Sequence, residues 1–567
     1  MVGDAEVLRR IYMVFQDINW TARPWVISDE RIFAGSDTFE ITYRARGTFD
    51  AEPFSFEATL SGDDEGTISF DVDGATSAPF MRNRLGLCVL HPMSAAGAAC
   101  LVESVTGETV ESHFPVDISP HQPFVDVRAI THEFTPGAWA SVRLGGETFE
   151  MEDHRNWTDA SFKTYCTPIS LPFPVEVTPD DAVLQGCTVA VDIEDIEPTT
   201  APVEVEVCLL PDSTLHVLPG RGLQLPDDEP PWSDRTRALL RSLSLSHLRI
   251  DMRADEDAAE HIRQGAAGAR AIGAALVVAL FVDDPDSLSA IAAATADVEV
   301  DCWLVFDAQA KVSGPGLATA ARTAFGPTAR IGGGTNLYFT ELNREPPTTD
   351  GLDVVAFSMN PQVHATDNAT IVQNVVTQQV VASEARRLAG NAALYVGPVT
   401  LRPRFNPNAT QPDLDVSNTR LPANVDARQC SLLGANWTIG SLKYLAEAGT
   451  VASVTYYETT GWRGVIERDS GSVGPDEFAS IPGEPFPILA AFESLVGFDS
   501  VRTCESNLPQ TVDALLLENA VGGQRLIVVS FTDVPTPVRL VGFTDAPTTI
   551  TLEPYGMQIL DLGKATA

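Results

Sequence analysis

Residues 234–284 decide the fold and read DRTRALLRSLSLSHLRIDMRADEDAAEHIRQGAAGARAIGAALVVALFVDD. Apolar residues recur at helical spacing over 234–246 and again over 256–273. The runs HLRIDMR (247–253) and ALVVALFVDD (275–284) are short and mostly apolar, as is typical of strands buried on both faces. This alternation of helices with buried strands predicts β-α units around a parallel sheet.

The alternation continues for most of the chain's second half. Further strand-like runs cover 302–308, 329–343, 354–364, 393–405 and 453–464, and helical runs cover 286–296, 316–325, 371–390 and 440–449. That makes seven strands, or eight if HVLPGRGLQL (216–225) opens the set. We therefore predict an α/β fold with a central (β/α)8 TIM barrel over 206–498 rather than an open sheet.

The sequence on either side of the barrel is β-rich. Short segments that alternate apolar with polar residues and break at Gly, Asp or Pro cover 38–49, 54–62, 66–74, 123–134 and 140–153. They predict an N-terminal β-sandwich over 1–205. Runs such as QRLIVVSF (524–531) and TTITLEP (548–554) predict a small C-terminal β domain over 499–567.

Charge excludes two classes of partner. With 37 basic and 77 acidic residues the formal charge is −40, which disfavours nucleic acid and anionic membranes. Lysine occurs four times (Lys163, Lys311, Lys443, Lys564), and the other basic residues are arginines. A GC-rich genome accounts for the lysine scarcity; a salty cytoplasm, in which charges are screened, accounts for the acidity as well and is favoured. Full activity in dilute buffer would contradict this halophilic interpretation.

Several other functions lack their motifs. The eight cysteines show no CxxC spacing, no glycine fingerprint supports a dinucleotide, and no GxSxG elbow supports a serine esterase. We expect neither a metal nor another cofactor. No signal peptide or apolar stretch of membrane-spanning length is visible, so we expect a soluble, cytoplasmic protein. The oligomeric state stays open.

Polar residues gather where the predicted barrel strands end, which is where barrel enzymes carry their reactive groups. Five strands contribute them: Asp251 and Arg253; Glu341 and Asn343; Asn360, Gln362 and His364; Arg402, Arg404 and Asn406; and Tyr457, Glu458, Trp462 and Arg463. So many polar groups are costly to bury unless they line a wet cleft. These positions are therefore the candidate site.

Glu341 and Glu458 end strands that are three apart, an arrangement that allows two carboxylates to face one substrate as acid and base. The structural alternative for each is an ion pair with Arg402, Arg404 or Arg463. His364 is an alternative base, and as a single histidine it is weak evidence for a metal. The two arginines either bind substrate or anchor the rim, while Tyr457 and Trp462 either stack on a sugar or belong to the core.

Residues 149–165, FEMEDHRNWTDASFKTY, are unusually rich in functional side chains for the edge of a β domain. This segment either makes a polar interface with the barrel or reaches into the active cleft. The first interpretation is favoured.

Five motifs together resemble the D-apionate (apionolactone) lactonase family, with a glycoside-hydrolase-like barrel. They are EMEDHRNWTDASFKTY (150–165), GGGTNLYFTELNR (332–344), SMNPQVHA (358–365), GPVTLRPRFNPNAT (397–410) and YYETTGWRGV (456–465). The resemblance runs from about Arg82 to about Gly464. It implies an N-terminal β domain, a central barrel, a C-terminal β domain, and hydrolysis of a sugar-acid lactone to the open aldonate.

On this basis we expect a hydrolase whose partner is a small sugar lactone. One of Glu341 and Glu458 would be the general base and the other the acid, with His364 as the alternative base. Asn343, Asn360 and Arg402 are candidates for polarising the carbonyl, and Arg253, Arg404, Tyr457 and Trp462 for binding the sugar. Two alternatives stay open: a glycoside hydrolase that uses the same glutamate pair, and a non-catalytic carbohydrate-binding protein.

Overall fold

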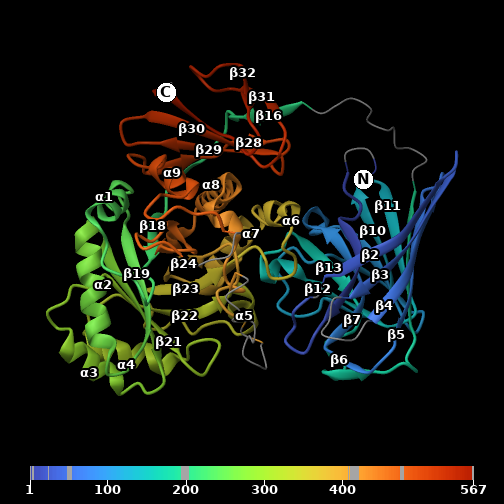
Figure 1. Cartoon of the computed structure of the whole chain (residues 1–567), viewed down its shortest axis with the longest axis horizontal. Coiled ribbons are helices and arrows are strands. Elements are labelled where there is room, and N and C mark those ends of the chain that lie inside the picture. The colour runs from blue at the N-terminus through green and yellow to red at the C-terminus, as the bar shows by residue number, and fades with distance from the viewer. Residues whose placement is uncertain are drawn as a thin grey trace. The chain divides into compact units, whose positions relative to one another are not determined.

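The computed structural model describes residues 2, 5–22, 24–47, 54–192, 204–406, 408, 421–472 and 478–564. Pro407, Ala409 and Thr410 of the fourth motif lie outside the described residues. The chain forms two compact units (Figure 1). The first comprises 1–156, 160–202 and 406–413, and the second comprises 157–159, 203–405 and 414–567.

The first unit is built on an antiparallel sheet of thirteen strands among the described residues, in the order β1-β7-β13-β12-β10-β11-β15-β5-β4-β3-β2, with β8 and β9 attached beside β10. Its strands are β1 (Arg10–Gln16), β2 (Trp25–Ala34), β3 (Thr38–Gly47), β4 (Phe54–Asp63), β5 (Thr67–Thr76), β7 (Arg84–Pro92), β8 (Ala99–Ser104), β9 (Thr109–His113), β10 (Phe124–Thr135), β11 (Ala138–Gly145), β12 (Phe149–Asp153), β13 (Ser161–Tyr165) and β15 (Val183–Val191). A separate pair joins β6 (Phe80–Arg82) to β14 (Val175–Val177), and η1 (Met93–Ala95) and η2 (His154–Trp157) are short 3-10 turns.

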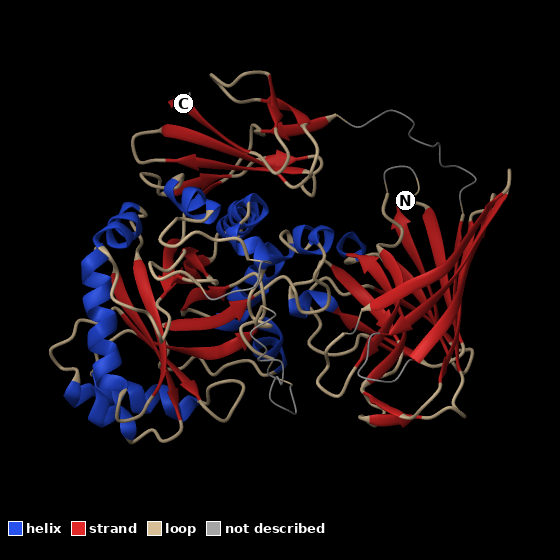
Figure 2. Ribbon diagram, viewed as in Figure 1, coloured by secondary structure: helices blue, strands red, loops and turns tan. Residues whose placement is uncertain are grey.

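Strands from both ends of this sheet contribute to one core. Phe15 of β1 and Phe54 of β4 belong to the same buried apolar cluster. Nε1 of Trp25, the first residue of β2, donates to the carbonyl of Met13 on β1 at 2.8 Å. The sheet therefore curls over its own inner face, as Figure 2 shows in red, and the predicted N-terminal β domain is confirmed.

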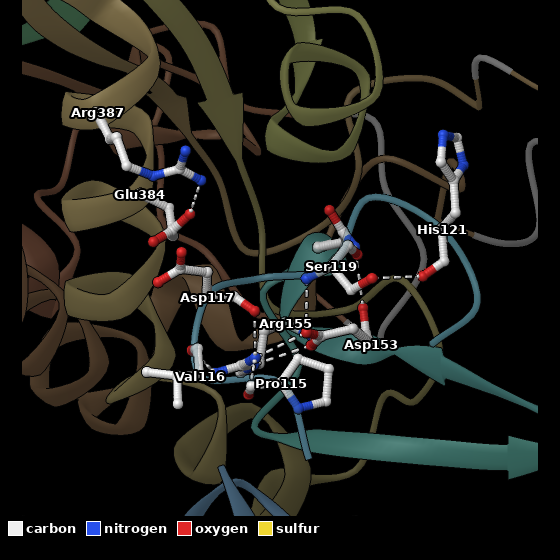
Figure 3. A network of polar contacts seen from close by, with 10 residues as sticks. Pro115, Val116, Asp117, Ser119, His121, Asp153, Arg155, Glu384 and Arg387 are labelled. Atoms are coloured by element: carbon white, nitrogen blue, oxygen red, sulfur yellow. Dashed lines mark hydrogen bonds and ion pairs between the residues drawn. The ribbon is translucent and has the colours of Figure 1, made fainter. Parts of the chain in front are cut away.

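A buried arginine fixes the segment that follows β12. Arg155 donates through Nε and NH2 to the carboxylate of Asp153 at 2.9 and 2.7 Å. Its remaining N–H groups reach the carbonyls of Pro115, Val116 and Asp117, and Asp153 also accepts from the amide of Ser119 (Figure 3). In the motif EDHRNW, the aspartate and arginine are therefore structural, and they hold the chain immediately before Trp157.

His132 makes this unit sensitive to acid. It is fully buried on β10, and burial lowers the pKa of its imidazole to about 4. Below pH 6.5 the unfolded chain takes up a proton that the folded chain does not, so stability falls as the pH drops. The difference between the pKa of about 4 in the folded chain and about 6.5 in the unfolded chain lowers the free energy of unfolding by about 3 kcal/mol at pH 4. Denaturation curves at pH 7 and pH 4 are expected to show a loss that is smaller in His132→Leu by about this amount; a part due to His91, which is also buried with a lowered pKa, remains. The exposed His113 is the control site, and equal pH dependence in His132→Leu and wild type would contradict the prediction.

The second unit contains the barrel. Eight parallel strands pair in chain order, and β18 closes the ring by pairing with β25. The strands are β18 (Gly220–Gln224), β19 (His247–Arg253), β20 (Ala275–Val282), β21 (Cys302–Asp307), β22 (Ile331–Tyr338), β23 (Val354–Met359), β24 (Ala393–Val399) and β25 (Val451–Thr460), followed by the short β26 (Gly464–Ile466). The predicted TIM barrel is confirmed, and HVLPGRGLQL does open it through β18.

Helices cover the outside of the barrel (Figure 2). They are α1 (Asp234–Ser242), α2 (Ala258–Ile272), α3 (Ser287–Ala294), α4 (Pro315–Phe325), α5 (Phe339–Arg344), α6 (Asn368–Gln373), α7 (Thr377–Ala389), α8 (Leu432–Glu447) and α9 (Pro487–Glu493), with the 3-10 turn η3 (Ala427–Cys430). The single helix predicted over 371–390 is divided into α6 and α7. It breaks at Asn374, whose amide nitrogen donates to Asp159 and to the carbonyl of Pro361. None of the described helices is long and apolar enough to cross a membrane.

Two further sheets complete this unit. One has the order β28-β16-β31-β32 and the other β17-β27-β29-β30-β33. Their strands are β16 (Val205–Cys208), β17 (Leu215–Val217), β27 (Ser500–Arg502), β28 (Glu505–Ser506), β29 (Val512–Glu518), β30 (Gly523–Ser530), β31 (Thr536–Val541), β32 (Thr549–Leu552) and β33 (Met557–Lys564). The C-terminal β structure thus incorporates two strands that precede the barrel in the chain.

Candidate active site

The candidate site is the mouth of the barrel, where all eight parallel strands end. The predicted residues lie on these strand ends or directly after them: Arg253 ends β19, Glu341 and Asn343 lie on α5 after β22, and Asn360 and His364 follow β23. Arg402 and Arg404 follow β24, and Tyr457 and Glu458 lie near the end of β25. Glu341 and Glu458 therefore belong to strands three apart, as the sequence predicts.

A buried ionic network ties together strands from different sides of the barrel. Arg249 on β19 donates to Asp251 at 2.6 Å, to Oδ1 of Asn336 on β22 at 2.8 Å and to the carbonyl of Gly397 on β24 at 2.7 Å. Arg404 donates to the same Asp251 and Asn336 at 2.9 and 2.7 Å. Burial acts to raise the pKa of Asp251, but the charges of Arg249 and Arg404 outweigh it and hold that pKa below its usual value. Arg404 thus lies in the mouth, where it holds the side chains of Asp251 and Asn336 in place.

Glu458 is a largely buried carboxylate near the end of β25. Its side chain is 13% exposed and lies 2.7 Å from NH2 of Arg463. A turn brings that arginine back, since the amide of Glu458 donates to the carbonyl of Arg463 at 2.8 Å. Burial raises the pKa of Glu458 even though Arg463 acts to lower it. A carboxyl in this state is suited to donating a proton.

A second acidic group lies after β18 and was missed by the sequence analysis. Burial raises the pKa of Asp227, and the charge of Asp251 raises it further. It could have been found from the sequence, because the acidic run Asp227, Asp228, Glu229 directly follows the first barrel strand. Glu229 is engaged by the hydroxyls of Thr459 and Thr460 at 2.7 and 2.6 Å.

Glu341 lies on α5 rather than on a strand. Its Oε1 is 3.0 Å from Nζ of Lys311, and its side chain is 6% exposed. The expected structural alternative was an arginine partner; the observed partner is this lysine. Asn343 is buried on the same short helix.

The loop after β23 carries a buried donor. Oδ1 of Asn360 accepts the amide of Gln362 at 3.0 Å, while its Nδ2 has no partner among the described residues. Gln362 donates to Asp426 at 2.7 Å, and Nε of Arg402 lies 3.3 Å from the same carboxylate. Asn360, Gln362 and Arg402 are thereby brought into one cluster. A buried N–H in this state would be stabilised by a ligand oxygen or by a bound water.

His364 lies in the middle of this loop and is paired. Its Nδ1 lies 2.6 Å from Oδ2 of Asp159, a residue that belongs to the barrel unit by its contacts. The ring of Trp157 meets the imidazole edge-on, with centroids 5.9 Å apart. The dense segment 149–165 thus supplies Trp157 and Asp159 to the barrel unit.

Three predicted substrate-binding residues have protein partners of their own. The hydroxyl of Tyr457 bonds to Thr438 on α8 at 2.8 Å, so this ring faces the helix layer. Trp462 packs against Phe478 with a centroid distance of 6.3 Å. Arg253 pairs with Asp283 on the rim and is 60% exposed.

Within the described residues of the barrel unit alone, no three His, Cys, Asp or Glu side chains converge at metal-ligand spacing. All eight cysteines are described, and all are free thiols.

Comparisons with known proteins cover both units. A family described as D-apionate lactonase, N-terminal domain, matches residues 1–194, and one described as D-apionate lactonase, TIM barrel domain, matches residues 221–500. The D-apionate lactonase of Brucella anthropi is 30% identical over 583 residues, covering 98% of this chain and 92% of that protein.

Solved structures that the comparison matches to this chain include glycoside hydrolases. The GH51 arabinofuranosidase of Xanthomonas axonopodis pv. citri is 10% identical, with a TM-score of 0.42 over 64% of this chain and 98% of that one. A family 39 glycoside hydrolase from Bacteroides cellulosilyticus WH2 is 9% identical, with a TM-score of 0.38 over 84% of this chain and 96% of that one. The two family matches and the near full-length relative confirm the resemblance found in the five motifs: the chain belongs to the D-apionate lactonase family.

Proposed function

We propose that this protein is a hydrolase that opens a sugar-acid lactone, resembling D-apionolactone, to its aldonate. The observation that carries the proposal is the 30% identity to a D-apionate lactonase over 98% of this chain. The barrel mouth supports it, because its groups match what ester hydrolysis needs: a base for water, donors for the oxyanion and an acid for the leaving oxygen.

The reaction adds one water molecule across the ring ester. The water oxygen bonds to the carbonyl carbon as a base removes its proton, and the carbonyl oxygen becomes an oxyanion. Collapse of this intermediate breaks the bond to the ring oxygen, which takes a proton from an acid. The products are a carboxylic acid and a hydroxyl on the same chain, and the carboxylic acid ionises at neutral pH.

Asn360 and Arg402 are the proposed donors to the oxyanion. Nδ2 of Asn360 is a buried donor without a described partner, and Arg402 is linked to the same cluster through Asp426. Burial lowers the pKa of Arg402, while the charge of Asp426 acts in the opposite direction. A fixed amide donor and a partly buried guanidinium stabilise negative charge more in the transition state than in the substrate.

Glu458 is the proposed acid, because burial raises its pKa and so keeps the carboxyl protonated to higher pH. For the base, the mouth offers Glu341 and His364, which follow the neighbouring strands β22 and β23. Arg253, Arg404 and Trp462 stay proposed sugar contacts, and Tyr457 is proposed to support β25 from the helix side.

Replacing Asn360 by Ala is expected to lower kcat by about 10²- to 10³-fold, the usual effect of removing one oxyanion donor. The expected change in KM is small because the donor acts mainly on charge that develops during the reaction. Steady-state kinetics on a lactone substrate measure both constants. Asn507→Ala, in the C-terminal sheets, is the control. A kcat within threefold of wild type for Asn360→Ala would remove this residue from the mechanism.

The proposed function is tested by a pH-indicator assay of acid release from a panel of aldonolactones, D-apionolactone included, with and without a chelator. Acid release from at least one of them is expected. Release of a reducing sugar from aryl glycosides without lactone turnover would favour the glycoside hydrolase. Thermal stabilisation by a lactone without turnover would favour the binding protein.

A further inference from the structure

The pair formed by Asp159 and His364 has the geometry of a proton-transfer dyad. We propose that Asp159 is a positioning residue that makes His364 the base that activates water in the barrel mouth. This inference rests on the proposed lactone hydrolysis and specifies which of its two candidate bases acts.

Asp159 is held rigidly from both of its oxygens. Oδ2 lies 2.6 Å from Nδ1 of His364, and Oδ1 accepts from Nδ2 of Asn374 at 2.9 Å. The same Nδ2 of Asn374 donates to the carbonyl of Pro361 at 2.9 Å, within the loop that carries the histidine. The side chains of Asp159 and His364 are only 5% and 14% exposed. A carboxylate fixed in this way sets both the position and the rotation of the imidazole.

The neighbouring rings restrict the imidazole further. Trp157 meets it at an interplanar angle of 87°, and the guanidinium of Arg344 lies 5.4 Å from the centre of the Trp157 ring. Arg344 ends α5, the helix that also carries Glu341. The break between α6 and α7 also helps to fix the imidazole, because Asn374 lies at this break and donates a hydrogen bond to Asp159.

The chemistry follows from which ring nitrogen carries the proton. A neutral histidine that donates from Nδ1 to a carboxylate has its lone pair on Nε2. Nε2 then accepts the proton of the attacking water, and the Asp159 carboxylate stabilises the imidazolium that forms, without itself being protonated. Glu458 protonates the ring oxygen, and the imidazolium proton returns through solvent to Glu458, so both groups end as they began.

The other candidate base is engaged differently. Oε1 of Glu341 lies 3.0 Å from the ammonium of Lys311, so this carboxylate is already engaged in an ion pair. His364 also shares the loop 360–367, between β23 and α6, with Asn360, so the proposed base and the proposed oxyanion donor lie on one short segment. Both observations favour His364.

The experiment compares Asp159→Asn, Asp159→Glu, His364→Gln and the double variant Asp159→Asn/His364→Gln on one lactone substrate. Asp159→Asn is expected to lower kcat by about 10²-fold or more while KM changes less than about threefold. Asp159→Glu is expected to recover at least tenfold of this loss. The double variant is expected to be no slower than His364→Gln alone, because residues that act as a unit are not additive. Asp367→Asn, at the start of α6, is the matched control, and melting temperatures show whether each variant is folded.

Nitrogen NMR of the wild-type protein provides a measurement that does not depend on the activity of any variant. The His364 signals, assigned by their absence in His364→Gln, are expected to show a protonated Nδ1 and an unprotonated Nε2. A protonated Nε2, additive losses in the double variant, or a kcat for Asp159→Asn within tenfold of wild type would each overturn the proposal. Activity abolished by a chelator would also overturn it, since His364 would then serve a metal. If the wild-type protein turns over no lactone, the proposed function itself fails.

Discussion

Replacing Glu458 by Gln is expected to lower kcat for lactone hydrolysis by about 10²- to 10⁴-fold, the range that general acid catalysis contributes. Glutamine keeps the shape of the side chain and a hydrogen bond acceptor toward Arg463, but it cannot supply a proton to the ring oxygen. The raised pKa of Glu458 gives the wild type a further signature. Its kcat should fall as the pH rises through that pKa, and Glu458→Gln should lack this decline.

Glu484→Gln is the matched control, because Glu484 is an exposed partner of Arg235 within the same unit. Pre-steady-state kinetics of wild type and both variants, at a series of pH values, separate the chemical step from product release. A Glu458→Gln enzyme within tenfold of wild type, or one that keeps the basic decline, would show that another group protonates the leaving oxygen. Asp227, whose pKa is also raised by burial, would be the next residue to change.

Replacing Lys443 by Met is expected to destabilise the second unit by about 3–5 kcal/mol, the usual cost of breaking a buried ion pair from one side. Nζ of Lys443 on α8 lies 2.9 Å from Asp513 on β29 and 3.9 Å from Glu447, and all three side chains are at most 5% exposed. Burial acts to lower the pKa of Lys443, but Asp513, Tyr444 and Glu447 together outweigh it and hold that pKa well above its usual value. Burial raises the pKa of Glu447 to about 7. Without the lysine, two acidic groups are left buried together.

Chemical denaturation measures this loss. Arg235→Met breaks an exposed ion pair and is the control, with an expected cost of about 1 kcal/mol or less. The double variant Lys443→Met/Asp513→Leu should recover part of the stability, because it removes the uncompensated carboxylate. A loss below 1 kcal/mol in Lys443→Met would mean that the cluster is hydrated or already neutral.

The sequence predicted the barrel because strands such as 275–284 are apolar throughout and alternate with amphipathic helices such as 256–273. It missed the place of β16 and β17, which are only four and three residues long. β16 pairs with β31, 333 residues later at Val205 and Val538, and β17 pairs with β27, 287 residues later at Leu215 and Arg502. Apolar periodicity also predicted one helix over 371–390. It cannot show that the side chain of Asn374 forms hydrogen bonds with Asp159 and Pro361 at the point where the helix breaks.

The candidate site was predictable to the level of strand ends. Glu458, Asn360 and His364 could be named because polar residues follow buried strands there. The sequence could not show which side of β25 the Tyr457 side chain takes. Strand alternation would put Tyr456 and Tyr457 on opposite sides, but Tyr456 also bonds to α8. The alternation is lost because Tyr457 has a φ of 32°. Asp159 lies 205 residues from His364 in the chain, so no local pattern relates the two.

Hydrolysis of a lactone in water enriched in ¹⁸O tests the central claim, that the barrel adds water to the acyl carbon of a sugar lactone. The aldonate formed from D-apionolactone by the wild-type protein should carry one ¹⁸O atom in its carboxylate and none in the released hydroxyl, as read by fragment masses. With Glu458→Gln the label should enter about 10²- to 10⁴-fold more slowly than with the wild type. Label found in the hydroxyl, or found in the anomeric position of a sugar released from a glycoside while the lactone stays intact, would contradict the account.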